Sequence, residues 1–323
     1  MNGQSVAAHE FSQAKKLLAQ EDIAREDKIE TLLEIADGLV NRPKVPKELK
    51  DAVELYDHAL ALCLDHEDIV QARITVRKGI ALQRVPEEGY EALMAARTAF
   101  TEAFPVIAAH GETVELAELH FHLGVVIHGL ADGQKALITD AISEYQSALR
   151  YFNSEHFPSE FALLHNNLAT AFLSIPATDE RSKIREALAV QSFESALEVV
   201  TLIDHPSEYA MLQNNLGNAL QYSSSSHPIE NNLRAIEAYD EALKVRTVTD
   251  APIEYANTIC NQANCLLNLP DDFEAPDQGN ARNLEEARAL YQEAAKIFLT
   301  HGETGKVNVV RETLADLERS SLG

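Results

Sequence analysis

The chain has 323 residues, of which 46% are hydrophobic and 6% aromatic, with no tryptophan. Its 51 acidic and 27 basic residues give a formal net charge of −24 at pH 7. This composition predicts a folded, helix-rich chain. It argues against nucleic acid or an anionic membrane as the main ligand, because both are bound by clustered lysine and arginine.

Three cysteines are too few for a disulfide framework. The first twenty residues lack a basic head followed by an apolar core, so we expect no secretory signal. No uninterrupted apolar run approaches about 18 residues, so we expect no membrane-spanning helix. These features together predict a cytoplasmic protein.

Residues 1–22 are expected to form an N-terminal packing helix, and residues 23–305 carry a pattern that recurs six times. Each copy begins with a helix that contains one small residue, and successive small residues are 43 to 48 positions apart. In the last five copies an alanine precedes the small residue by seven positions. The six small residues are Ala36, Gly79, Gly124, Ala169, Gly217 and Ala263.

A second helix is expected after each of these, with an aromatic residue four positions after one alanine and three before another. The aromatic residues are Tyr56, Phe100, Tyr145, Phe193, Tyr239 and Tyr291. Spacings of four and three place the ring and both alanines on one helix face. Such a face suits a close helix–helix contact, because the alanines admit the neighbour and the ring fills the gap.

The distance from the last alanine of one copy to the small residue of the next is 20 or 21 residues throughout. The loop inside each copy varies instead, as ATDERSKIRE, SSSSHPIENN and DDFEAPDQGN show. Fixed junctions between copies and variable loops within them are typical of a solenoid. Residues 306–323 are expected to form a polar C-terminal capping helix.

The pattern A-x-x-x-N-N-L-G-N-A at 210–219, followed by A-x-x-x-Y-x-x-A-L at 235–243, resembles the tetratricopeptide repeat (TPR). The period near 45 is similar to the lengthened repeats of kinesin light chains and bacterial signalling proteins. The resemblance implies an all-α fold, a right-handed α-solenoid of six TPR-like helix pairs with N-terminal and C-terminal capping helices. It also implies a single domain over residues 1–323.

In TPR solenoids the first helix of each pair lines a concave groove, at positions six and three before the small residue and one and four after it. The N-terminal half of this groove is expected to be apolar and the C-terminal half rich in amides. The candidate partner-binding residues are Val76, Ile80, Phe121, Val125, Asn166, Thr170, Asn214, Asn218, Asn257 and Asn264.

An asparagine amide both donates and accepts, so a row of them can hold an extended peptide by its backbone. The alternative is that some of these asparagines only bond neighbouring helices. Arg73 is the only basic residue at the groove positions, so the carboxylate clamp of some cochaperone TPR domains is not expected. The acidic composition favours a neutral or basic partner.

Nothing in the sequence indicates an enzyme, a cofactor or a metal site. Phosphate-binding, dinucleotide-binding, nucleophile-elbow and zinc-protease motifs are missing from it. His120 and His122 point about 200° apart on a helix and cannot share an ion. Cys260 and Cys265 have no flanking base, so no catalytic residue is expected.

These observations predict a non-enzymatic scaffold or adaptor that binds a peptide or helix of a partner protein in its groove. An alternative is a dedicated assembly or maturation chaperone for an enzyme subunit. A second alternative is a peptide-sensing regulator, although the repeats leave no room for a separate output domain. Self-association is also open, because solenoid faces and end helices often pair.

Overall fold

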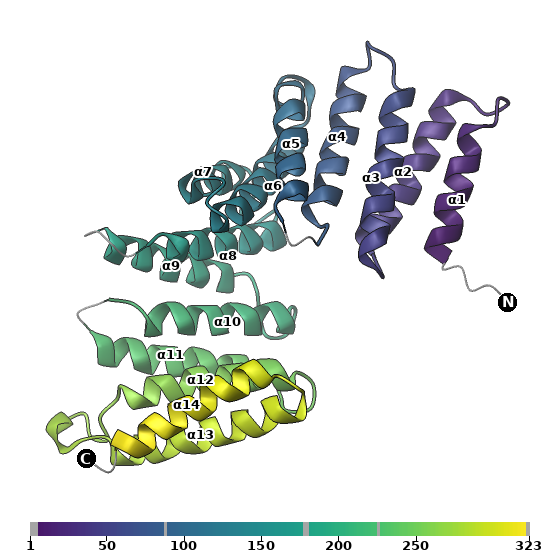
Figure 1. The fold of residues 1–323 in the computed structure, drawn as a ribbon. Helices are drawn as coiled ribbons and strands as arrows, with labels where there is room; N and C mark the ends of the chain where they lie inside the picture. The colour runs from purple at the N-terminus through teal and green to yellow at the C-terminus, as the bar shows by residue number, and fades with distance from the viewer. Residues whose placement is uncertain (1–5, 87–88, 177–180, 225–226, 321–323) are drawn as a thin grey trace. The chain divides into compact units, whose positions relative to one another are not determined.

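The computed structural model describes residues 6–86, 89–176, 181–224 and 227–320 (Figure 1). These residues form fourteen α-helices and one short 3-10 helix, and they contain no strand. Each helix packs most extensively on its neighbour along the chain, in the order of the repeat. The chain is therefore an all-helical α-solenoid.

The chain divides into two compact units, which are Met1–Asn153 and Ser154–Gly323. The first contains α1 (Val6–Leu18), α2 (Arg25–Asn41), α3 (Pro46–Leu62), α4 (Asp68–Gln83), α5 (Glu91–His110), α6 (Thr113–Asp132) and α7 (Ile138–Ala148). The second contains α8 (Pro158–Ser174), α9 (Ser182–Leu197), α10 (Pro206–Gln221), α11 (Pro228–Leu243), α12 (Pro252–Leu267), the 3-10 helix η1 (Pro276–Gln278), α13 (Ala281–Thr300) and α14 (Thr304–Ser320). The expectation of a single domain stays a prediction.

The predicted contact between a ring and a small residue holds the helix pairs together. A Cβ atom added to Gly79 would lie 2.4 Å from the Phe100 ring, and one added to Gly217 would lie 2.5 Å from the Tyr239 ring. All six aromatic residues of the second helices are at most 3% exposed. The predicted pairing of α2 with α3 and of each later first helix with its second helix is therefore confirmed.

Proline places the start of several helices. Pro46, Pro158, Pro206, Pro228 and Pro252 each occupy the first helical turn. Proline suits this position because its fixed φ is already helical and its missing N–H would have no partner there in any case. The junctions before α8, α10 and α12 therefore end in the same way, which keeps their geometry alike.

The two ends of the chain carry the expected extra helices. Ala14 of α1 is buried against the apolar residues of α2 and α3, and Val307 and Val310 of α14 are buried against α12 and α13. The helices run from Val6 to Leu18 and from Thr304 to Ser320. The N-terminal helix ends four residues before the expected position 22, because residues 19–22 form a turn. Residues 1–5 and 321–323 lie outside the described residues, as do positions 177–180 and 225–226 of the variable loops.

One helix, α5, is long and apolar enough by length and composition to cross a membrane. Its buried residues include Ala96, Phe100 and Ala103, which are the repeat's ring and alanine positions. A helix that supplies the core of a soluble protein passes the same test of length and composition. The apolar character of α5 thus has an explanation within the repeat, where it packs on α4 and α6.

Candidate partner-binding site

All ten candidate residues lie on first helices, and all are partly exposed. The second unit carries the six polar ones, two each on α8, α10 and α12: Asn166, Thr170, Asn214, Asn218, Asn257 and Asn264. The first unit carries the four apolar ones, two each on α4 and α6: Val76, Ile80, Phe121 and Val125. We call the exposed face of α8, α10 and α12 the first-helix surface of the second unit.

Asparagines two positions before the small residue link neighbouring first helices in the second unit. Asn215 Nδ2 of α10 donates to Asn166 Oδ1 of α8 at 3.3 Å. One repeat further, Asn261 Nδ2 of α12 donates to Asn218 Oδ1 of α10 at 2.9 Å. The second asparagine of the pair at 214–215 therefore has a structural reason, since it ties α10 to α8, and Asn261 at the same repeat position ties α12 to α10.

Several asparagines of the first-helix surface also hold buried groups. The Tyr239 hydroxyl lies 2.8 Å from Asn218 Oδ1 and equally far from Gln221 Oε1. The Tyr291 hydroxyl donates to Asn264 Oδ1. The carbonyl oxygens of Asn218 and Asn264 are thus committed to the fold.

Asn214 is engaged in a similar way, because its Oδ1 accepts from Thr258 Oγ1 at 3.1 Å. Asn257 is different, since no protein atom in the described part of the chain bonds to its side chain. Some of these asparagines therefore bond neighbouring helices, as the alternative interpretation of the sequence stated. Their N–H2 groups and Asn257 are what the row still offers to a ligand.

In the first unit, α4 and α6 are joined on the same face. Arg73 of α4 forms a bidentate pair with Glu115 of α6, with Nε–Oε1 at 2.7 Å and Nη2–Oε2 at 3.0 Å. The guanidinium holds the pKa of the Glu115 carboxyl below its usual range. Because Arg73, the one basic residue at the groove positions, is already paired with Glu115, it is not free to bind the carboxylate of a partner.

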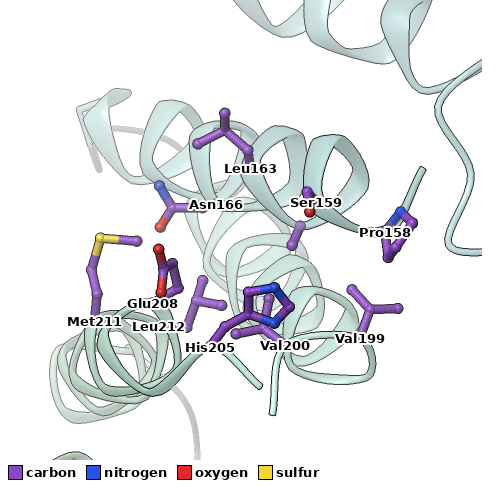
Figure 2. Close-up of a pocket in the computed structure, with 11 residues that line it drawn as sticks. Pro158, Ser159, Leu163, Asn166, Val199, Val200, His205, Glu208, Met211 and Leu212 are labelled. Carbon is purple, nitrogen blue, oxygen red and sulfur yellow. The ribbon is translucent and has the colours of Figure 1, made fainter. Parts of the chain in front are cut away.

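An open pocket of about 260 Å³ lies between α8 and α10 in the second unit (Figure 2). Its lining is mainly apolar and comes from three places, the start of α8, the turn after α9, and the start of α10. The lining residues are Pro158, Ser159, Ala162, Leu163, Asn166, Val199, Val200, His205, Glu208, Met211 and Leu212. Leu163 is 46% exposed and Met211 36% exposed, so the pocket opens onto the first-helix surface.

Glu208 gives this pocket its charge. It lies in the first turn of α10, and Figure 2 shows it with Met211 and Leu212 on one side of the pocket, facing Asn166 on the α8 side. Within the part of the chain that the structure describes, its carboxylate has no hydrogen-bond or ion-pair partner. The site therefore combines an apolar lining with one unpaired negative charge.

Only Asn166 of this pocket is among the ten candidates from the sequence. Leu163 and Met211 occupy the groove position six before the small residue, so the repeat offset was a signal for them. Val199, Val200 and Glu208 carried no such signal, because they belong to the junction and to the start of the helix. Their place in the pocket follows from the packing of α9 between α8 and α10.

Groups with catalytic potential are held in structural environments. Burial raises the pKa of the Cys260 and Cys265 thiols to about 12, so both are neutral at pH 7. His120 Nδ1 lies 2.6 Å from Glu144 Oε2, and His122 Nδ1 lies 3.1 Å from Gln83 Oε1. The described residues contain no group of three potential metal ligands.

No protein-family model and no curated protein sequence matches this chain. Solved structures do match it over most of its length. BtubC (BKLC) from P. vanneervenii is 17% identical with a TM-score of 0.52, and the match covers 74% of this chain and 88% of that one.

Two further structures are similar. The C-terminal part of a TPR repeat-containing protein from Cytophaga hutchinsonii is 12% identical with a TM-score of 0.53, covering 89% of this chain and 95% of that one. The apo form of RapI is 13% identical with a TM-score of 0.53, covering 97% and 87%. At such identities the likeness is one of fold, and the fold is that of a TPR-like helical repeat protein.

Proposed function

We propose that this protein is a non-enzymatic interaction scaffold that binds a peptide or helical segment of a partner protein on its first helices. The observation that carries the proposal is the open pocket between α8 and α10. Two of its apolar side chains, Leu163 and Met211, stand exposed beside the asparagines of the first-helix surface. A small apolar pocket next to polar groups suits an anchoring side chain together with the backbone that bears it.

The asparagines of the first-helix surface support the same function, although fewer of their polar atoms can bind a ligand than the sequence suggested. The Asn218 and Asn264 oxygens hold buried tyrosines, so the amide N–H2 groups are available to the carbonyl oxygens of a bound backbone. Asn257, which has no protein partner in the described region, offers both an acceptor and a donor. The partner is expected to be neutral or basic, because the chain carries a net charge of −24.

A pair of matched double variants tests this function. Leu163→Ser with Met211→Ser changes the exposed apolar side chains of the pocket, whereas Ile229→Ser with Leu233→Ser changes side chains of 38% and 37% exposure on the second helix α11. In a pull-down from the native host's lysate read by mass spectrometry, we expect a stoichiometric partner that the α11 variant retains and the pocket variant loses.

Both variants replace partly exposed residues and are expected to keep the circular dichroism spectrum and melting temperature of the wild type within a few degrees. A partner that binds both variants equally would place the interaction away from the pocket. A partner lost only from the α11 variant would transfer the proposal to the second helices.

A further inference from the structure

Several contacts between neighbouring first helices involve a cation of the chain itself. Between α2 and α4, Arg25 pairs with Glu67 at 2.7 and 2.8 Å. Between α4 and α6, Arg73 pairs with Glu115. These two arginines come from different positions of the repeat, yet each places a guanidinium against a carboxylate at the start of the next first helix.

Cations of the chain also lie near the helix pairs at the C-terminal end. Between α10 and α12, Arg246 Nη1 donates to Thr258 Oγ1 at 3.0 Å, and the charge of Glu254 opposes the effect of burial on the arginine's pKa. At α14, Lys306 lies over the Phe298 ring at 5.4 Å, with Glu303 at 3.9 Å. Of these cations, only Arg246 lies at a repeat position that can be compared directly with the pocket between α8 and α10.

The junction between α8 and α10 keeps the carboxylate, but the pocket lining contains no arginine or lysine, and its other titratable side chain is His205. Counted from the small residues Gly217 and Ala263, Glu208 occupies the place of Glu254. Val200 stands where Arg246 stands, and Leu212 stands where Thr258 stands. The two substitutions remove the guanidinium and its hydrogen-bond partner, and the open pocket lies there.

We propose that this pocket binds an arginine side chain of the partner polypeptide, with its aliphatic stem on Val200, Leu212 and Met211 and its guanidinium against Glu208. The inference rests on the proposed function and names what the partner must present. An arginine combines an apolar stem with a cationic head, which matches an apolar pocket that carries one carboxylate at its rim.

The size of the pocket agrees with one side chain as the occupant. Sites for whole small molecules or cofactors enclose roughly 300–1,000 Å³, whereas this one encloses about 260 Å³. Arg246 occupies the equivalent place one repeat later, where its guanidinium donates to Thr258 Oγ1 and is partly buried. Lysine has the same charge but no planar fork for a bidentate contact, so we expect it to bind more weakly.

The experiment is a selection from a displayed library of random 12-residue peptides on the immobilised full chain, made in parallel on three proteins. These are the wild type, Glu208→Gln, and Glu237→Gln, which removes the same charge from the exposed side of α11. We expect arginine to be enriched in peptides selected on the wild type and on Glu237→Gln, and not in those selected on Glu208→Gln.

A cycle with one selected peptide then locates the arginine. Replacing its arginine by citrulline, which keeps the shape and removes the charge, should weaken binding to the wild type by about fivefold to tenfold, as measured by fluorescence anisotropy. The same replacement should have little effect on binding to Glu208→Gln, because the charge it would meet is already gone.

A further variant fills the pocket from within. Val200→Arg with Leu212→Thr reproduces the junction between α10 and α12, and it should no longer bind the selected peptide. An equal citrulline effect in the wild type and Glu208→Gln would overturn the arginine pocket. Selected peptides that lack arginine, yet bind less well to Leu163→Ser with Met211→Ser, would overturn it and leave the proposed function standing. A selection that enriches no peptide would overturn both.

Discussion

The hydroxyl of a buried tyrosine in the second helix needs a hydrogen-bond acceptor on the first helix. In three pairs the ring is a tyrosine whose hydroxyl donates to the first-helix residue after the small one, as Tyr56 does to Asp37 at 2.5 Å and Tyr239 does to Asn218. Where the ring is Phe100, the matching first-helix residue is Ile80. A buried hydroxyl without an acceptor would cost about 1–3 kcal/mol, so ring and acceptor must agree within each pair.

A partly buried histidine gives the residue-scale prediction. Burial lowers the pKa of His122 from 6.5 to about 4, and its ring lies near those of Phe100 and Phe121. The unfolded chain therefore takes up the proton first as the pH falls. The free energy of unfolding should decrease between pH 6.5 and about 4, by at most about 1.4 kcal/mol per pH unit from this group.

Urea unfolding of the wild type and His122→Leu at pH 7, 5.5 and 4.5 measures this effect. The difference in unfolding free energy between the two proteins should shift in favour of the variant as the pH falls, because leucine does not titrate. A difference that stays constant across this range would show that His122 has an ordinary pKa in the folded protein.

At the scale of the helix pair, the ring of the second helix takes the space of the missing side chain on the first. The Tyr239 and Phe100 rings approach the backbone of α10 and α4 at Gly217 and Gly79. Ala36, Ala169 and Ala263 occupy the same place in other pairs and are fully buried. The position thus accepts a hydrogen atom or a methyl group according to how closely its own ring packs.

Two glycines with opposite surroundings test this packing. Gly217→Leu should lower the free energy of unfolding by about 1–3 kcal/mol, because the new side chain meets the Tyr239 ring. Gly38→Ala, on the interior of α2, meets nothing within 4 Å and should raise it by roughly 0.5–1 kcal/mol. Urea denaturation at pH 7 measures both, and a Gly217→Leu protein as stable as the wild type would show that the ring moves aside freely.

At the scale of the whole molecule, charge is the dominant property. The chain has a net charge of −24, and the ion pairs among its described residues are mostly exposed. Exposed pairs contribute about 0–1 kcal/mol each, whereas the excess of negative charge repels itself throughout the fold. Self-repulsion should therefore outweigh the ion pairs in the response to salt.

Thermal unfolding should report this balance. Raising the NaCl concentration from about 20 mM to about 300 mM shortens the screening length severalfold, and we expect the melting temperature to rise by a few degrees. The same change in salt should weaken the binding of an arginine-containing peptide, because that contact is an attraction between opposite charges. A melting temperature that falls with salt would mean that ion pairs outweigh the repulsion.

The helices, their pairing and the identity of the buried rings follow from the sequence alone. This was possible because the repeat shows six times which residues share a face, and local spacing fixes that face. It also indicated the polar surface of α8, α10 and α12.

The packing of the helices decides which of those polar groups can bind a ligand and where the open pocket lies. The sequence assigns Asn218, Asn264 and Asn257 alike to the groove. In the structure, hydrogen bonds from Tyr239 and Tyr291 occupy the side-chain oxygens of Asn218 and Asn264. The pocket beside Glu208 forms because side chains of α8, of the turn after α9 and of α10 leave space there, whereas Arg246 stands at the position of Val200 one repeat later. Such a space is a property of packing between distant residues, and no local pattern encodes it.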